Sequence, residues 1–312
     1  MFRKREGGFA VIVYSELSSL CRDLGFTARE LYAASRNTDR LYRKAVLPKA
    51  GGGVRELSVP SPLLKAIQTA VYEKLLSQEP VSRYACAYRP GGGIKRCAAP
   101  HVGRGQVLTL DIRRFFDSAI YPLIKEKVFA PERYSAPNRV LLSMLCTYRD
   151  ALPQGAPSSP AISNILLYGF DEAVGEYCRE RGIRYTRYCD DMAFSGLFDA
   201  RELTAFVESE LRKLGFYLNR KKTRLVRPGQ RQAVTGVIVN EKLAVPREYK
   251  RRLRQELYYI EKYGMEEHLS RLGGEAQNVD YAARLLGKVN YVLSIEPGNI
   301  EAAHWARLLK DK

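Results

Sequence analysis

Three aspartates stand where a carboxylate could do chemistry. Asp111 interrupts an otherwise apolar run from Leu108 to Ile112, and Asp190 and Asp191 are adjacent at the centre of a second β-prone segment. An ionised carboxylate in an apolar strand is costly unless it is paired or bound to a metal. If the two segments lie side by side, the three carboxylates converge, and oxygen-only ligands favour Mg²⁺ or Mn²⁺. Two such ions about 4 Å apart can activate an attacking hydroxyl and stabilise a leaving pyrophosphate.

Each acid also has an ordinary structural alternative. Asp111 could be a salt-bridge partner, and Asp190-Asp191 could be a polar turn. A pair of adjacent aspartates is weak support by itself. The catalytic interpretation therefore depends on several segments occurring together and in order.

The elements that must position these acids follow an α+β pattern. Strands are predicted over 107–112, over 184–195 as a hairpin, and as short pieces over 233–245, with a further hairpin over 49–59 around three glycines. Helices are predicted over 15–47, 203–214 and 247–263, and Thr27-Ala28-Arg29-Glu30 in the first range matches a capping box. Two more helices are expected where a serine precedes proline, at Ser61-Pro62 and at Ser159-Pro160, the second running toward Cys178.

The charge balance favours a polyanionic partner. Lys and Arg number 51 against 34 acids, which gives a net charge of +17, and 20 Tyr and 11 Phe offer stacking surfaces for bases. The densest basic cluster comprises Arg247, Lys250, Arg251, Arg252 and Arg254. Like charges so close repel, and a phosphate backbone would relieve that repulsion, whereas the ordinary alternative is a solvated helix face. Lys250, Arg251 and Arg254 are the candidate RNA contacts.

Other composition features narrow the class of protein. The six cysteines form no Cys-x-x-Cys pair, which predicts reduced thiols in a cytoplasmic protein. Three histidines offer few ligands for zinc. The apolar run from Phe9 to Tyr14 is too short for a signal peptide, and no stretch is long and apolar enough to span a bilayer. We therefore expect no membrane partner.

Four segments resemble, in order, the palm motifs of reverse transcriptases. They are residues 110–116 (LDIRRFF), residues 152–160 (LPQGAPSSP), residues 188–191 (YCDD), and residues 214–216 with Asn219, Lys222 and Thr223. Residues 49–68 resemble the fingers region of the same family. The resemblance implies an α+β right-hand polymerase with an antiparallel palm sheet. Its expected parts are an N-terminal helical region (1–47), fingers (48–105), a palm with interleaved fingers elements (106–232), and a palm–thumb connection with a basic helical thumb (233–312).

The resemblance also implies a role for each matched residue. Asp111, Asp190 and Asp191 would be the catalytic metal ligands, with the Ile112 carbonyl completing one sphere, although neighbouring strand residues such as Asp190 and Asp191 point to opposite faces. The implied contacts to the incoming nucleotide are Lys49 and Arg55 at the triphosphate, Phe116 under the sugar, Gln154 in its loop, and Lys222 as proton donor to pyrophosphate. The alternatives are core packing for Phe116 and solvation for Lys49 and Lys222.

Two further segments resemble elements of retron reverse transcriptases. Val234-Thr235-Gly236 matches a Val-Thr-Gly signature, and residues 98–101, ending at His101, resemble an Asn-Ala-x-x-His element. Here Cys97 stands at the Asn position, and a thiol cannot replace the hydrogen bonds of an amide. Both elements would contact RNA, unless His101 is simply packed in its loop.

Membership of the retron type implies a set of partners. A cognate structured noncoding RNA would be template and primer, and dNTPs would extend a 2′-hydroxyl of that RNA to give a branched RNA–DNA product. The resemblance further implies a part in phage defence and an accessory effector protein encoded nearby.

Three other functions stay open at the level of sequence. Another bacterial reverse transcriptase, of group II intron, abortive-infection or diversity-generating type, is the nearest, although Gln154-Gly155 with Ser159-Pro160 disfavours the last. Phe116 disfavours an RNA-templated RNA polymerase. A non-catalytic RNA-binding protein on a polymerase scaffold has no reason to place three acids beside RNA.

Overall fold

A four-stranded antiparallel sheet, the palm sheet, lies at the centre of the molecule. The computed structural model describes residues 2–4, 10–48, 52–272 and 281–310. The strands follow the spatial order β6 (Arg184–Tyr188), β7 (Asp191–Gly196), β5 (Gln106–Asp111) and β8 (Arg224–Val226). The predicted buried strand and the predicted hairpin are thus direct neighbours, because β5 and β6 both pair with β7.

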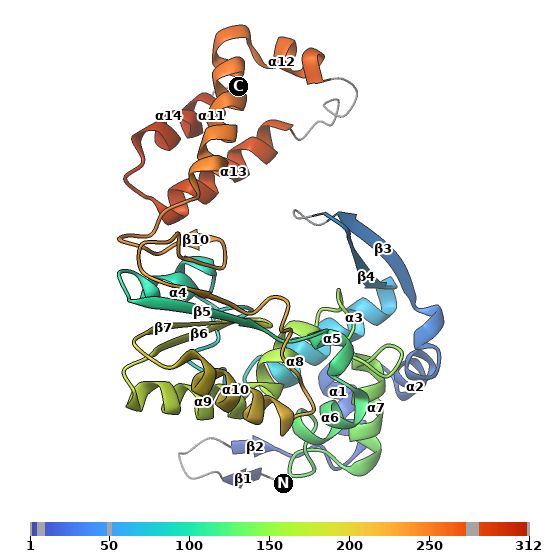
Figure 1. Cartoon of the computed structure of the whole chain (residues 1–312). Helices are drawn as coiled ribbons and strands as arrows, with labels where there is room; N and C mark the ends of the chain where they lie inside the picture. Colours follow the sequence, from blue (N-terminus) through green and yellow to red (C-terminus); the bar gives the residue numbers. More distant parts are fainter. Residues whose placement is uncertain (1, 5–9, 49–51, 273–280, 311–312) are drawn as a thin grey trace.

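Two hydrophobic cores lie on opposite faces of this sheet. Leu108 and Leu110 of β5 pack into one core with residues of α9 (Tyr168–Glu180) and α10 (Ala200–Arg212), which cover that face in Figure 1. Val107 packs into the other core. Successive strand residues point to opposite faces, so β5 is buried from both sides. The single carboxylate in this strand therefore falls at its end, next to the turn between β6 and β7.

The fingers are built around a hairpin of β3 (Tyr42–Pro48) and β4 (Val54–Pro60), whose register runs from Tyr42 opposite Pro60 to Pro48 opposite Val54. Helix α3 (Pro62–Val71) packs against β4, and it contacts α1 (Leu17–Leu24) and α2 (Ala28–Arg36) in turn. The predicted caps at Thr27 and Ser61 are confirmed. Thr27 and Glu30 form a capping box, and the Ser61 hydroxyl accepts from the Leu64 amide at 3.4 Å.

The prediction of helix throughout 15–47 is wrong at its end. Helical structure stops with η1 (Thr38–Arg40), and residues 42–48 form β3. Short strands β1 (Phe2–Lys4) and β2 (Ala10–Ile12) also precede the first helix. Pairing along seven residues of β4 decides the conformation of 42–48, because strand preference depends on neighbouring strands more than on local sequence.

The helix predicted from Ser159 toward Cys178 is in fact two helices. These are α8 (Ser159–Leu166) and α9, which meet at Leu167. The Ser159 hydroxyl does not cap α8 but donates to the Pro153 carbonyl at 2.8 Å. The remaining elements between the fingers and the palm are η2 (Tyr72–Leu76), α4 (Ile94–Ala98), η3 (Ala99–His101), α5 (Phe115–Ser118), α6 (Tyr121–Lys127) and α7 (Ala136–Cys146).

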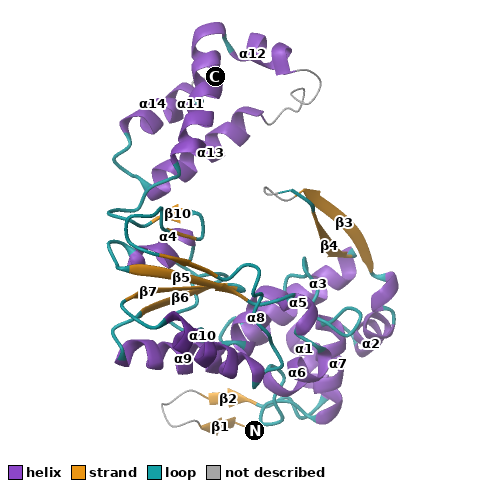
Figure 2. Cartoon of the chain, viewed as in Figure 1, coloured by secondary structure: helices purple, strands orange, loops and turns teal. Residues whose placement is uncertain are grey.

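The C-terminal part is helical, as predicted, and follows a small hairpin of β9 (Ala233–Val234) and β10 (Val237–Ile238). We call its four helices the thumb: α11 (Arg247–Tyr263), α12 (Met265–Leu272), α13 (Tyr281–Ile295) and α14 (Ile300–Leu308). Their apolar side chains belong to the second core, the one that also contains Val107 of β5. In Figure 2 the thumb and the β3–β4 hairpin rise on the same side of the palm sheet. Among the described helices, none is long and apolar enough to cross a membrane.

Candidate active site

The three predicted catalytic acids meet at one end of the palm sheet. Asp111 ends β5 and is paired in register with Asp191, which begins β7. The Ile112 amide donates to the Asp190 carbonyl at 3.0 Å. We call residues 188–191 the catalytic turn. Pairing between distant segments thus brings together acids that are about 80 positions apart in the chain.

Asp111 is almost fully buried, at 3% exposure, and every oxygen of its carboxylate has a partner. Lys222 Nζ donates to Oδ2 at 2.7 Å, and Asn219 Nδ2 donates to Oδ1 at 3.0 Å. The Asn219 amide also donates to the Asp111 carbonyl at 2.8 Å. These contacts offset the cost of burying a charge. They also fix the segment after α10 to the end of β5.

The other two acids are less well compensated. Burial raises the pKa of Asp190, and the nearby charge of Asp111 adds to the effect. Partial burial raises the pKa of Asp191 to about 6, with further contributions from Asp190 and Asp111. Ionised carboxylates that disfavour one another in this way form a site for cations.

The chemistry of these donors fits a divalent metal such as Mg²⁺, which prefers carboxylate oxygens. As the side chains lie, no three His, Cys, Asp or Glu residues of the described ranges are grouped closely enough to hold an ion. Asp111 is instead held by Lys222 and Asn219. An ion that binds Asp111 Oδ2 would share that oxygen with the Lys222 ammonium or displace it. The Ile112 side chain is buried, and a metal contact through its carbonyl stays a prediction.

The predicted nucleotide contacts come from three separate elements. Arg55 lies exposed on β4, whereas Lys49 lies outside the described residues. Gln154 is half-buried, and its carbonyl accepts from the Ser58 amide of β4 at 2.7 Å. Gly155 approaches the same strand so closely that a Cβ would lie 2.7 Å from the Ser58 carbonyl oxygen. This loop therefore needs glycine to lie against the fingers.

Two adjacent phenylalanines at the start of α5 have different environments. Phe115 is 2% exposed and belongs to the core, whereas Phe116 is half-buried and packs edge-on against it, with ring centroids 5.4 Å apart. The core alternative therefore describes Phe115 better than Phe116. A role for Phe116 under the sugar stays a prediction.

The structure assigns His101 to the interior, which does not fit the expected contact with RNA. The side chain is 0% exposed, and its Nδ1 and Nε2 lie 2.7 Å from Ser195 Oγ and 2.8 Å from Thr186 Oγ1. Burial lowers its pKa to about 4. The Cys97 thiol lies 3.3 Å from the same Thr186 hydroxyl. His101 thus joins η3 to the palm sheet as a neutral ring.

The Val-Thr-Gly segment forms the turn between β9 and β10. Thr235 and Gly236 have φ values of 48° and 82°, a left-handed pair that suits a tight hairpin and explains the glycine. Val234 is buried. A cavity of about 420 Å³ separates this turn from the catalytic turn, and its lining includes Tyr188, Asp191, Thr235 and Gly236. The retron-like segment and Asp191 therefore line one cavity.

The thumb cations are not equally available. Lys250 Nζ lies 2.9 Å from Glu296 Oε1, and Arg254 Nη2 lies 2.7 Å from Glu301 Oε2. Arg251 is exposed and makes no ion pair with the described part of the chain. Repulsion in the basic cluster of α11 is thus partly relieved within the protein, which the sequence interpretation did not foresee.

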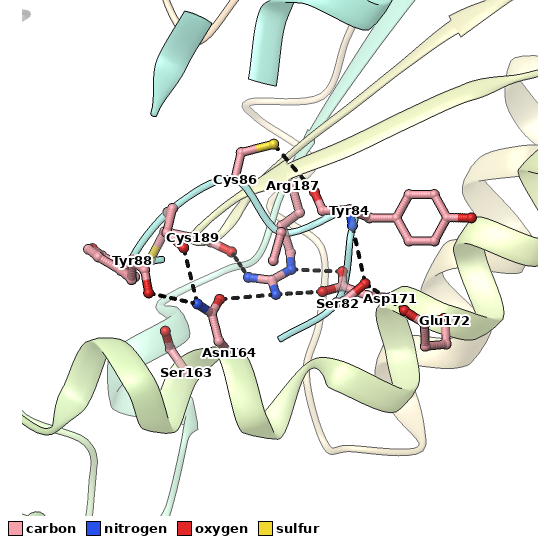
Figure 3. A network of polar contacts seen from close by, with 12 residues as sticks. Ser82, Tyr84, Cys86, Tyr88, Ser163, Asn164, Asp171, Glu172, Arg187 and Cys189 are labelled. Atoms are coloured by element: carbon pink, nitrogen blue, oxygen red, sulfur yellow. Dashed lines mark hydrogen bonds and ion pairs between the residues drawn. The ribbon is translucent and has the colours of Figure 1, made fainter. Parts of the chain in front are cut away.

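Sequence reasoning missed a buried cation directly behind the catalytic turn. Arg187 of β6 is 0% exposed and lies between Asp171 of α9, Asn164 of α8 and the Cys189 carbonyl (Figure 3). The available signal was an arginine inside a strand whose neighbours are β-prone. A buried arginine requires a buried partner, but nothing in the sequence indicated Asp171.

Comparison with known proteins agrees with this geometry. The family model described as reverse transcriptase (RNA-dependent DNA polymerase) matches residues 47–250. The Retron Mx65 reverse transcriptase of Myxococcus xanthus is 36% identical over 299 residues, which cover 86% of this chain and 65% of that protein. The chain thus spans about two thirds of the length of that relative. The Retron Ec86 reverse transcriptase of Escherichia coli is 30% identical over 267 residues, which cover 83% of this chain and 82% of that protein.

Among solved structures, a telomerase of Candida tropicalis in complex with a TWJ fragment of telomeric RNA has a TM-score of 0.49 at 12% identity. The match covers 87% of this chain and 55% of that one. The family model and the two retron enzymes suffice for the assignment. The chain belongs to the reverse transcriptase family of RNA-dependent DNA polymerases, and within that family to the retron type.

Proposed function

We propose that this protein copies part of a cognate structured noncoding RNA into DNA, starting from a 2′-hydroxyl of the same RNA. The convergence of Asp111, Asp190 and Asp191, the last of which lines a cavity together with the Val-Thr-Gly turn, is the observation that carries the proposal. The names of its relatives, both retron enzymes, support the retron part of it. The branched product and a role in phage defence with an accessory effector remain parts of the proposal.

In this proposal the palm acids hold two Mg²⁺ ions, which would lower the pKa of the attacking hydroxyl and neutralise the leaving pyrophosphate. The hydroxyl oxygen forms a bond to the α-phosphorus of a dNTP, and the bond from that phosphorus to the pyrophosphate oxygen breaks. Lys222 lies beside Asp111 and can give its proton to the pyrophosphate. A lysine so close to a carboxylate has its pKa raised, and it is protonated at neutral pH.

The remaining residues would place the substrates. Arg55, together with Lys49, is proposed to bind the triphosphate from the fingers side, because both are basic residues of the hairpin region. Phe116 is proposed to lie under the sugar and exclude a 2′-hydroxyl. Gln154 would act through its loop, which is tied to β4.

The RNA is proposed to enter from the thumb side. The cavity between the catalytic turn and the Val-Thr-Gly turn is of a size for one nucleoside, and we assign it to the nucleotide that carries the priming hydroxyl. Arg251 and, after exchange of their acidic partners, Lys250 and Arg254 would contact phosphates. The parts named as fingers, palm and thumb are proposed to divide at residues 48, 106 and 233.

The test is DNA synthesis by purified protein with Mg²⁺ on two templates, the RNA encoded immediately upstream and a generic primed RNA, beside Asp190→Asn. Branched DNA from the upstream RNA alone, lost in the variant, is the expected result. Synthesis on the generic template alone would assign the chain to another type of reverse transcriptase. RNA binding without synthesis on either template would contradict the enzymatic function.

A further inference from the structure

The guanidinium of Arg187 makes four hydrogen bonds in the interior of the palm. Nε donates to Asp171 Oδ1 at 2.8 Å, and Nη2 donates to Asp171 Oδ2 at 2.5 Å, which forms a two-pronged pair between two residues of 0% exposure. Nη2 also donates to Asn164 Oδ1 at 3.3 Å. Nη1 points the other way and donates to the Cys189 carbonyl at 2.9 Å. Figure 3 shows these contacts converging on one side chain.

A buried ion pair of this kind is weak support for stability. The cost of removing both charges from water offsets most of their attraction, and well-packed apolar residues often serve a core equally well. What a guanidinium adds is direction, because its donors lie in a fixed plane and each one can be assigned to a separate acceptor. A buried guanidinium is therefore useful where a neighbouring group must be held in a fixed orientation.

That group is the peptide between Cys189 and Asp190. Cys189 has a φ of 58°, a left-handed conformation that is unfavourable for a residue other than glycine. Its carbonyl, which Nη1 holds, belongs to the same peptide plane as the Asp190 amide. On its other side, the Asp190 carbonyl accepts from the Ile112 amide at 3.0 Å. Asp190 is therefore fixed between two backbone anchors, one from β5 and one from Arg187.

The same residue also connects the turn to neighbouring segments. The Arg187 amide donates to the Tyr84 carbonyl at 2.8 Å, and the Arg187 carbonyl accepts from the Cys86 amide at 2.7 Å. Asn164 extends the network, because its Nδ2 donates to the Ala87 carbonyl at 3.0 Å. Asp171 lies on α9 and Asn164 lies on α8. The guanidinium therefore connects the catalytic turn to two helices of the palm.

We propose that Arg187 is a positioning residue of the polymerase site, which acts through the Cys189 carbonyl to fix the orientation of Asp190. The inference rests on the proposed polymerase function. It assigns to Arg187 no contact with substrate. Its loss should leave a folded protein whose aspartates are misplaced, and a misplacement of about 1 Å can reduce a rate on the order of 10²-fold.

The experiment compares Arg187→Lys with Tyr185→Phe. The lysine keeps a positive charge beside Asp171 but cannot reach Asp171 and the Cys189 carbonyl together. Tyr185→Phe is the matched control, because it removes another buried hydrogen bond to Asp171 Oδ1, of 2.7 Å, and leaves the turn untouched. For each variant we would measure Tm, kcat and KM on an already primed RNA template, and Mn²⁺ binding without substrate by electron paramagnetic resonance.

We expect both variants to lower Tm, and only Arg187→Lys to change the site. Its kcat per folded molecule should fall on the order of 10²-fold with little change in KM, and its Mn²⁺ affinity should fall with it. Tyr185→Phe should keep both within about twofold. Parallel losses in the two variants, or an Arg187→Lys protein with normal kcat and Mn²⁺ binding, would overturn the proposal.

Two provisions keep the test decisive. If Arg187→Lys does not melt cooperatively, Asp171→Asn replaces it, because the amide keeps the shape and loses one prong of the pair; an unchanged kcat in that variant would equally overturn the proposal. Wild-type protein is measured on the same primed template. Absence of synthesis and of Mn²⁺ binding by the wild type would refute the polymerase function itself, which separates that failure from a failure of the Arg187 assignment.

Discussion

Acidic residues at the palm end and in the thumb have opposite electrostatic surroundings. In the thumb, burial opposes ionisation of Glu296, but hydrogen bonds from Lys250, the Val245 amide and Asn299 outweigh it and lower its pKa. The pKa of Glu301 is also lowered, by its contact with Arg254. At the palm end the pKa values of Asp190 and Asp191 are raised.

The difference separates a structural use of charge from a functional one. The thumb acids are compensated within the chain, so their charge stabilises the packing of α11 against the α13–α14 region. The palm acids keep a mutual repulsion that contributes to the raised pKa values of Asp190 and Asp191, whereas Asp111 is held by Lys222 and Asn219. Carboxylates that are held close together although they repel one another indicate a site for cations.

The largest expected effect comes from breaking the palm side of this comparison. Asp111→Asn removes one carboxylate charge and weakens the hold on Lys222, so we expect DNA synthesis to fall at least about 10³-fold, as loss of a central electrostatic group does. Primer extension at saturating dNTP measures this. Asp117→Asn is the control, since Asp117 is an exposed acid paired with Arg114 on the neighbouring short helix. Equal losses in the two variants would deny the palm acids their special role.

The next largest effect is expected from the buried contacts of His101 with Ser195 and Thr186, and it concerns the free energy of unfolding. The pKa of His101 in the folded protein is about 4, against about 6.5 when unfolded. Its contribution is therefore fully present above pH 6.5 and is lost as the pH falls toward 4, by about 3 kcal/mol in all.

Urea unfolding of wild type and His101→Gln at several pH values measures that contribution. The two curves should converge as the pH falls from 6.5 to 4, because only the wild type carries the histidine term. His304→Gln, at an exposed histidine of α14, is the control and should run parallel to the wild type. A His101→Gln curve that stays parallel to the wild type would place this histidine in solvent.

A smaller effect is expected from breaking the thumb side. Glu296→Ala leaves Lys250 and the Val245 amide without their acceptor, so the free energy of unfolding should fall by about 1–3 kcal/mol. Glu301→Ala breaks a more exposed pair and should cost less than about 1 kcal/mol. Thermal melting of both variants tests the order, and a greater cost for Glu301→Ala would reverse our assignment of the tightly held acid.

The smallest effect distinguishes cations within the thumb. Arg251→Ala should weaken binding of a structured RNA a few-fold and reduce the slope of log affinity against log salt by about 1, because a phosphate contact is lost. Arg254→Ala should reduce the slope less, since Glu301 already neutralises that arginine. Fluorescence titrations between low and moderate salt measure both slopes. A larger change for Arg254→Ala would mean that its ion pair opens on RNA.

The sequence was informative where the signal is local or the chemistry is unusual. The caps at Thr27 and Ser61 involve residues three apart, and α11 spans the same residues, 247–263, that the sequence predicts as a helix. Asp111 was conspicuous because a charge in an apolar strand needs a reason. The family motifs then supplied the fold, which single elements would not have specified.

What the sequence did not reveal depends on distant partners. The strand at 42–48 exists because β4 pairs with it. His101 can be buried because its two ring nitrogens form hydrogen bonds with Ser195 and Thr186, which are more than 80 positions away in the chain. Lys250 forms its ion pair with Glu296, which is 46 positions further along the chain. Arg187 and Asp171 are only 16 positions apart, but a strand and a helix must pack before the pair exists.

If the palm acids repel one another in the absence of a bound cation, the melting temperature should respond to Mg²⁺. At pH 7 without metal, Asp190→Asn should melt higher than wild type, because one of the repelling charges is gone. Addition of 10 mM Mg²⁺, a concentration on the order of those used with weak carboxylate sites, should raise the Tm of wild type and leave the variant nearly unchanged. A wild type that melts higher than Asp190→Asn without metal and does not respond to Mg²⁺ would contradict the account.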